Sequence, residues 1–211
     1  MSESSAAFGL RLNALLIQAG LDPLDPALTD RFESYLVLLM RWNARINLTA
    51  IREEEGILSR HFVESIHCAR ALPAGIATLL DFGSGAGFPG IPIALCRPAI
   101  SVTLAESNGK KAAFLHEAVR TLGISAYICA QRAESLSGPF ECVTLRAVDR
   151  MPHAVKAASS LVARRGWLAL MTTRAELPVL QAKAPSTFSW PTVLELPGSQ
   201  GRLLALGQQI E

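Results

Sequence analysis

The sequence has few of the residues that mark metal sites, disulfides or membrane segments. Its four cysteines show no Cys-x-x-Cys spacing, so we expect reduced cysteines in the core. Of its four histidines, His61 and His67 are six positions apart and lie on different faces of a helix, so we expect no metal site. No apolar run approaches the roughly 18 residues of a membrane span. The N-terminus has no signal-peptide pattern. We therefore expect a cytoplasmic protein with no membrane partner.

The chain also lacks an excess of charge of either sign. It has 20 basic and 18 acidic residues among 211, a net charge of +2. Sixteen of the basic residues are arginine, whose forked group suits phosphate or carboxylate. A phosphate-facing rim and ordinary solvated faces explain the following arginines equally well: Arg41, Arg45, Arg146, Arg150, Arg164 and Arg165. Charge alone therefore gives no argument for a nucleic-acid partner.

Glycine, in contrast, is dense in one short segment. Residues 79–90 read Leu-Leu-Asp-Phe-Gly-Ser-Gly-Ala-Gly-Phe-Pro-Gly, with Gly83, Gly85 and Gly87 at alternate positions and Gly90 after a proline. Glycine permits positive φ and lets another molecule approach the backbone. Such a loop, placed between a strand and a helix, holds adenosine-containing cofactors in doubly wound α/β folds.

The spacing of this loop discriminates between cofactors. A nicotinamide-binding loop requires Gly-x-Gly-x-x-Gly, and here Phe88 takes the third glycine position. A triphosphate-binding loop ends in Gly-Lys-Ser/Thr, which is missing. The remaining pattern, Asp-x-Gly-x-Gly-x-Gly, resembles the first motif of S-adenosylmethionine-dependent methyltransferases.

A carboxylate follows at the distance that this cofactor requires. Residues 101–106 read as a second strand that ends in Glu106, 23 positions after Gly83. An acid about 20 residues past a glycine loop can accept hydrogen bonds from the ribose hydroxyls. We therefore expect Gly83, Gly85 and Glu106 to bind the cofactor.

Periodicity divides the chain into a helical region, 1–75, that packs on a core, 76–211. The first region predicts helices at 9–19 and 53–71, and between them a helix that Thr29 or Asp30 caps and that extends to Ile46. From residue 77 strands and helices alternate, which indicates a mostly parallel sheet of an α/β fold. The predicted strands are 77–82, 102–106, 126–130, 141–146, 166–172, 191–196 and 202–206. The predicted helices of the core are 89–96, 109–122, 152–162 and 175–181.

With these motifs in place, the chain resembles the bacterial 16S rRNA guanine-N7 methyltransferases of the RsmG (GidB) family. The resemblance rests on residues 41–52, 60–66, 81–92, 107–115, 131–134 and 146–148. The Gly-Phe-Pro-Gly-Ile-Pro extension of the glycine loop is its most specific part. The resemblance implies a Rossmann-like methyltransferase fold with a seven-stranded sheet. It also implies transfer of a methyl group to N7 of a guanosine in 16S rRNA of the 30S subunit, in a hairpin of the decoding region. We expect a monomer.

The resemblance also implies cofactor contacts at Gly83, Phe88, Ala133, Glu134 and Arg146. Arg146 is the best candidate for the methyl-transfer site, because it ends the fourth strand and can hold a carboxylate or phosphate bidentately. An ion pair with an acid such as Glu134 or Asp149 is the alternative role.

Two positions depart from the family pattern. Leu145 stands where the family usually has a serine before the arginine. After the fifth strand the family commonly has Lys-Gly, and this chain reads Met-Thr-Thr-Arg at 171–174, so Arg174 is the candidate substitute for that lysine.

N7 methylation needs no general base, because N7 carries a lone pair and no proton. The sequence accordingly leaves the catalytic residue unassigned, and His61 reads as a packing or cap contact. A flipped guanine is expected to stack on an aromatic, with Phe88 and Trp42 as candidates. Phe88 also fits as a wall of the cofactor site, and Trp42 also fits the core by its phase with Leu39 and Ile46.

Three other functions remain open from the sequence. A small-molecule methyltransferase would share the loop and Glu106, with the helical region as its lid. A nicotinamide oxidoreductase is opposed by Phe88. A non-catalytic RNA-binding module could retain the fold and lose the cofactor.

Overall fold

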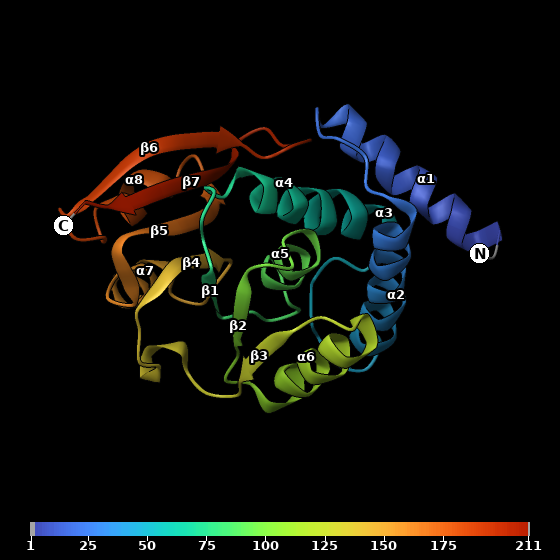
Figure 1. The fold of residues 1–211 in the computed structure, drawn as a ribbon, viewed down its shortest axis with the longest axis horizontal. Helices are drawn as coiled ribbons and strands as arrows, with labels where there is room; N and C mark the ends of the chain where they lie inside the picture. Colours follow the sequence, from blue (N-terminus) through green and yellow to red (C-terminus); the bar gives the residue numbers. More distant parts are fainter. Residues whose placement is uncertain (1–2, 211) are drawn as a thin grey trace.

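The structure, a computed structural model shown in Figure 1, describes residues 3–210. Met1, Ser2 and Glu211, at the outer ends of the two expected regions, lie outside the described residues. The N-terminal region consists of α1 (Glu3–Gln18), α2 (Pro26–Asn43), α3 (Glu54–Ile57), a π-helical turn η1 (Leu58–Val63) and α4 (Glu64–Ala71).

One mixed sheet of seven strands follows, in the order β3-β2-β1-β4-β5-β7-β6. The strands are β1 (Thr78–Phe82), β2 (Ser101–Ala105), β3 (Ala126–Cys129), β4 (Phe140–Arg146), β5 (Val162–Thr173), β6 (Phe188–Glu195) and β7 (Arg202–Gln209). The first five are parallel, and β7 runs antiparallel to both β5 and β6. The expected α/β class, the mostly parallel sheet and the antiparallel terminal pair are confirmed.

Helices cover both faces of the sheet (Figure 1). They are α5 (Gly90–Cys96), α6 (Gly109–Leu122), α7 (Met151–Ser159) and α8 (Leu177–Gln181), with a short 3₁₀ turn η2 (Ala133–Ser135). Alternate strand residues face opposite sides, so Leu79 and Cys142 pack with α1–α6, while Leu80 and Val143 pack with α7 and α8. The N-terminal helices therefore share one hydrophobic cluster with the sheet.

Helix α2 begins earlier than the sequence analysis predicted. Asp25 is its N-cap, and the Asp25 carboxylate accepts a 2.8 Å hydrogen bond from the Leu28 N–H. Pro26 takes the first helical position, where a missing N–H costs nothing. The prediction of a cap at Thr29 or Asp30 is wrong, because Asp25 and Pro26 together already supply the start signal.

Helix α1 begins six residues before its predicted start at 9, and most of the other boundaries lie within four residues of those predicted. Helix α6 agrees with its predicted span, with Asn108 as N-cap and Gly123 in the left-handed region at its end. Strand β5 starts four residues before its predicted start at 166, because a register shift between Phe140 and Cys142 of β4 lets the two strands pair further.

All four cysteines are free thiols, and three of them, Cys68, Cys129 and Cys142, are buried. Burial raises the pKa of Cys68 and Cys96 to about 12. These thiols are therefore protonated and unreactive at neutral pH.

Candidate active site

A cavity of about 810 Å³ lies at the carboxyl edge of the sheet. The glycine loop after β1, Glu106 after β2, the segment 146–149 at the end of β4 and the end of β5 form its walls on the sheet side. Residues 48–51 and 60–61 close it from the N-terminal region. Ligands of open α/β sheets bind at this edge. The cavity is therefore the candidate active site.

Two of the four loop glycines line the cavity, and open space lies in front of Gly85 only, because a β-carbon at Gly83 would lie 3.1 Å from Val148 Cγ2. Gly83 and Gly85 line it with φ of +74° and +56°, which only glycine adopts readily. A β-carbon built at Gly85 would meet nothing nearer than 3.9 Å, so backbone alone forms this wall.

The other two glycines are needed for packing within the protein. A β-carbon at Gly87 would lie 2.4 Å from Ile91 Cδ1 and 2.8 Å from the Tyr35 hydroxyl oxygen. At Gly90 it would lie 2.6 Å from Asp81 Oδ2. Gly87 and Gly90 are therefore required by packing within the protein, and the expected cofactor contacts at Gly83 and Gly85 concern the other two glycines.

Asp81, the acid that opens the motif, is buried and does not line the cavity. Its Oδ2 accepts a hydrogen bond from the Gly90 N–H at 3.1 Å, and its Oδ1 accepts one from the Thr144 hydroxyl at 2.8 Å. Burial raises the pKa of Asp81 to about 6, although these hydrogen bonds favour the charged form and oppose the effect. Asp81 holds the start of α5 and β4 against β1.

Glu106 faces the glycine loop, as its spacing predicts. Its Oε2 accepts a 3.0 Å hydrogen bond from the Gly85 N–H, and its Oε1 accepts a 2.7 Å hydrogen bond from the Asn108 N–H. The residue is only 9% exposed and lines the cavity. Each carboxylate oxygen keeps a second lone pair. These two hydrogen bonds hold the Glu106 side chain in place, and its carboxylate can still accept hydrogen bonds from the two ribose hydroxyls of a nucleoside. The site therefore fits the expected cofactor.

The structure brings Gly83, Gly85, Phe88, Glu106 and Arg146 together around the cavity. Ala133 and Glu134 lie on η2 after β3, outside the cavity lining, with Ala133 buried and Glu134 exposed. Their contact with a cofactor stays a prediction.

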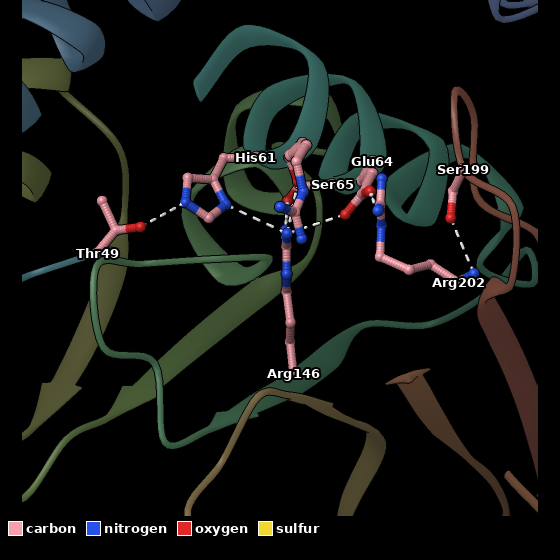
Figure 2. Close-up of polar contacts among 8 residues, drawn as sticks. Thr49, His61, Glu64, Ser65, Arg146, Ser199 and Arg202 are labelled. Atoms are coloured by element: carbon pink, nitrogen blue, oxygen red, sulfur yellow. Dashed lines mark hydrogen bonds and ion pairs between the residues drawn. The ribbon is translucent and has the colours of Figure 1, made fainter. Parts of the chain in front are cut away.

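Arg146 is bound to the N-terminal region (Figure 2). Its Nη2 donates to Glu64 Oε2 at 2.9 Å and to the carbonyl of Arg60 at 2.5 Å, and its Nη1 donates to Ser65 Oγ at 3.2 Å. Burial lowers the pKa of Arg146, and the carboxylate of Glu64 opposes that effect. The ion pair expected with Glu134 or Asp149 is instead made with Glu64, an acid that the sequence analysis did not single out.

Glu64 binds a second arginine from the far end of the chain. Its Oε1 accepts a 2.7 Å hydrogen bond from Arg202 Nε on β7, and Glu64 is 1% exposed. One buried carboxylate therefore ties the N-terminal region to β4 and β7 (Figure 2).

His61 is the cavity residue that the sequence analysis underrated. Its ring stacks on Phe88 with centroids 4.6 Å apart and an interplanar angle of 16°. Its Nε2 lies 2.7 Å from Thr49 Oγ1 and its Nδ1 lies 3.2 Å from Arg146 Nη2. Burial, then the charges of Arg146 and Arg60, lower its pKa to about 3, so the ring is neutral at physiological pH.

The two aromatic candidates for stacking are differently placed. Phe88 is buried between His61 and the ring of Tyr35, 5.3 Å away, and it lines the cavity. Trp42 packs edge-on against Phe114, and its Nε1 donates to Glu117 Oε2 at 2.8 Å, away from the cavity. Of the two readings of Trp42, the core reading is confirmed.

The arginine that follows β5 does not take the place of a lysine at the cavity. Arg174 is exposed and forms an ion pair with Glu195, and it is not part of the cavity lining. The cations that do line it are Arg60, Lys111, Arg146 and Arg202, and the described residues include no ion-pair partner for Arg60 or Lys111.

Two general features of residues 3–210 bear on the expected chemistry. They include no group of three or more His, Cys, Asp or Glu residues arranged to hold a metal ion. None of the helices in this range has the length and apolar character needed to cross a membrane.

Comparison with known proteins adds a family assignment to this geometry. The family model described as rRNA small subunit methyltransferase G (GidB) matches residues 28–202. The ribosomal RNA small subunit methyltransferase G of Halorhodospira halophila is 42% identical over 187 residues, which cover 85% of this chain and 87% of that protein. The protein of the same description from Stenotrophomonas maltophilia is 42% identical over 151 residues, 70% of each chain.

A solved structure supports the fold alone. A SAM dependent methyltransferase from Aquifex aeolicus superposes with a TM-score of 0.57 at 13% identity. The match covers 74% of this chain and 94% of that one.

Proposed function

The chain belongs to the rRNA small subunit methyltransferase G (GidB) family, and on that premise we propose that its cavity transfers a methyl group from S-adenosylmethionine to N7 of a guanosine in 16S rRNA. We propose that the enzyme acts on the assembled 30S subunit in the cytoplasm. We also propose that it acts as a monomer. The observation that carries the proposal is the pair formed by the bare backbone at Gly85 and the carboxylate of Glu106, hydrogen-bonded to each other at one wall of the cavity.

This wall fits the two ends of the cofactor. The bare backbone at Gly85 leaves room for its amino-acid end, with Gly83 beside it in the same wall, and Glu106 has free lone pairs for its ribose hydroxyls. Bound S-adenosylmethionine supplies a methyl group on a positively charged sulfur, which a nucleophile with a free lone pair can attack directly. We propose that Phe88 and Arg146 border the same ligand, and that Ala133 and Glu134 border its adenine.

The residues of the cavity suit chemistry in which no proton is removed. Guanine N7 has a free lone pair, so the protein has to align it with the methyl group and stabilise the positive charge that spreads over the ring. His61 is neutral and both of its nitrogens are engaged, so it is not placed to act as a base. The carboxylates of Asp149 and Glu176 line the same cavity and can stabilise a cationic base.

The N-terminal region argues against a lid over a small-molecule site. Tyr35 of α2 donates a hydrogen bond to the carbonyl of Ala86 in the glycine loop, and Glu64 binds arginines of β4 and β7. These contacts fix the region to the core, whereas a lid has to open. The small-molecule alternative is therefore not favoured.

The test is methyl transfer with labelled S-adenosylmethionine to 30S subunits and to 16S rRNA that lack the modification. We expect label in 7-methylguanosine at one position of 16S rRNA, located by mass mapping of the nucleosides. Transfer of label to a metabolite extract would support the small-molecule alternative. Failure to bind S-adenosylmethionine in calorimetry, with NAD as the comparison ligand, would support a non-catalytic module or an oxidoreductase.

A further inference from the structure

The hydrogen-bonding state of His61 can be derived from its neighbours. The two hydrogens of Arg146 Nη2 are directed to the Arg60 carbonyl and to Glu64, and this cationic group lies 3.2 Å from Nδ1 of His61. A hydrogen on Nδ1 would face a positively charged donor, so Nδ1 carries its lone pair there. A neutral imidazole with an acceptor at Nδ1 carries its proton on Nε2. The pKa of about 3 agrees with a neutral ring. His61 therefore presents an Nε2–H to Thr49 (Figure 2).

That proton fixes the role of the Thr49 hydroxyl. Thr49 Oγ1 accepts from His61 Nε2–H at 2.7 Å and from the Ile51 N–H at 3.1 Å. A hydroxyl oxygen has two lone pairs, and both are used by these two donors. The hydroxyl hydrogen is then left to donate, and within residues 3–210 it has no acceptor among the hydrogen bonds of Thr49. Thr49 lines the cavity, so this hydrogen is available to a ligand there.

A fixed donor in this cavity suits one purine better than the other. The edge of guanine that carries N7 also carries O6, and both are acceptors. Adenine has N7 on the same edge, next to an amino group that only donates. We propose that the Thr49 hydroxyl donates a hydrogen bond to O6 of the target guanine. The hydrogen bonds from His61 and Ile51 occupy the lone pairs of that hydroxyl and so leave it as a donor.

The inference rests on the proposed function, because it assigns one contact of the methyl acceptor in that site. Thr49 is a specificity-determining residue in this assignment, and His61 is a positioning residue that acts through it. The wall that carries Thr49 belongs to the N-terminal region, whereas the groups that fit the cofactor, Gly85 and Glu106, follow β1 and β2. This separation favours the acceptor base over the cofactor as the partner of Thr49.

The experiment uses 30S subunits reconstituted from ligated 16S rRNA in which the methylated guanosine is replaced by 2-aminopurine. This base keeps N7 and lacks O6. Wild-type enzyme should lose about 5-fold in kcat/KM on this substrate, the effect of one neutral hydrogen bond. If wild-type enzyme methylates both substrates equally, O6 is not read and the inference is overturned, whatever the variants do.

Two variants assign the contact to Thr49. T49V removes the hydroxyl donor and keeps the shape of the side chain. We expect its kcat/KM to be about 5-fold below that of the wild type on the guanosine substrate, and equal to that of the wild type on the 2-aminopurine substrate. T49S keeps the hydroxyl and should retain the wild-type preference. A T49V enzyme that still prefers guanosine about 5-fold overturns the inference, as does a T49V enzyme whose calorimetric affinity for S-adenosylmethionine falls by the same factor. Absence of 7-methylguanosine with wild-type enzyme and native subunits would instead overturn the proposed function.

Discussion

The hydroxyl of Tyr35 donates a 2.5 Å hydrogen bond to the main-chain carbonyl of Ala86, and this contact joins α2 to the glycine loop. Tyr35 is fully buried, and burial raises the pKa of its hydroxyl well above the ordinary value, so the group stays protonated as a donor. The conformation of a loop that belongs to the sheet therefore depends on a side chain of the N-terminal region.

Tyr35→Phe should lower both stability and cofactor affinity. The change leaves the buried carbonyl of Ala86 without its partner, which costs about 1–3 kcal/mol in the free energy of unfolding. Urea denaturation and calorimetric titration with S-adenosylmethionine measure the two effects. Tyr127→Phe is the matched control, because Tyr127 is 67% exposed. Equal stability of the two variants would contradict a structural role for the Tyr35 hydroxyl.

Glu64→Gln should be strongly destabilising, because it leaves the guanidinium groups of Arg146 and Arg202 without their carboxylate. Removal of one partner of a buried ion pair costs about 3–5 kcal/mol. Glu195→Gln breaks the exposed pair with Arg174 and should cost no more than about 1 kcal/mol. Denaturant unfolding of both variants checks this difference, and a Glu64→Gln protein as stable as Glu195→Gln would refute it.

The contribution of His61 to the free energy of unfolding should fall as the pH drops below 6.5. Its folded-state pKa of about 3 lies below the unfolded value of 6.5, so its contribution is complete above pH 6.5 and is lost as the pH falls toward 3. The slope that it adds approaches about 1.4 kcal/mol per pH unit. His61→Phe, which keeps a ring against Phe88, should remove that slope from the unfolding free energy measured between pH 4 and 7.

Asp81 acts in the opposite direction over part of this range. Its folded-state pKa of about 6 lies above the unfolded value of 3.8, so its contribution is present below pH 3.8 and is lost as the pH rises through 6. The difference between wild type and His61→Phe isolates His61, because Asp81 is present in both proteins. An unchanged slope in the variant would show that folding does not lower the pKa of His61.

Glu106→Gln should weaken the binding of S-adenosylmethionine by about 10- to 100-fold. A hydrogen bond to a charged carboxylate contributes about 1.5–3 kcal/mol, and the amide also offers only one acceptor oxygen. Calorimetry measures the affinity, and Glu195→Gln, which changes no residue of the cavity lining, should bind as the wild type does. Unchanged affinity in Glu106→Gln would place the ribose elsewhere.

Arg60→Ala should weaken the binding of 16S rRNA and reduce its dependence on salt. Arg60 lines the cavity and has no ion-pair partner among the described residues, so its charge is available to a phosphate. Loss of one phosphate contact lowers the slope of log affinity against log salt by about 0.7 for single-stranded RNA. Filter binding at several salt concentrations measures the slope, with Arg174→Ala as the control that leaves it unchanged.

Local features of this protein could be predicted from the sequence, and long-range ones could not. The glycine loop and Glu106 were found because their meaning depends on spacing within one βαβ unit. The periodicity of the apolar residues favours a cap at Thr29 or Asp30, whereas the actual cap is Asp25, which Pro26 follows. The partner of Arg146 could not be found, since Glu64 is 82 positions away and its neighbours in sequence read as an ordinary helix. The role of His61 depends on Thr49, Phe88 and Arg146 together, and only the folded chain brings these residues into contact.

The buried carboxylate of Glu64 also sets an order on the maturation of the chain during translation. Its two arginine partners lie 82 and 138 positions later in the sequence, so Glu64 emerges from the ribosomal exit tunnel before either of them. Until β7 has emerged, the carboxylate of Glu64 lacks Arg202 as a partner, and α4 lacks its ion pair with β7. A nascent chain that stops before Arg202 therefore has an incomplete cavity, because Arg202 is one of the residues that line it.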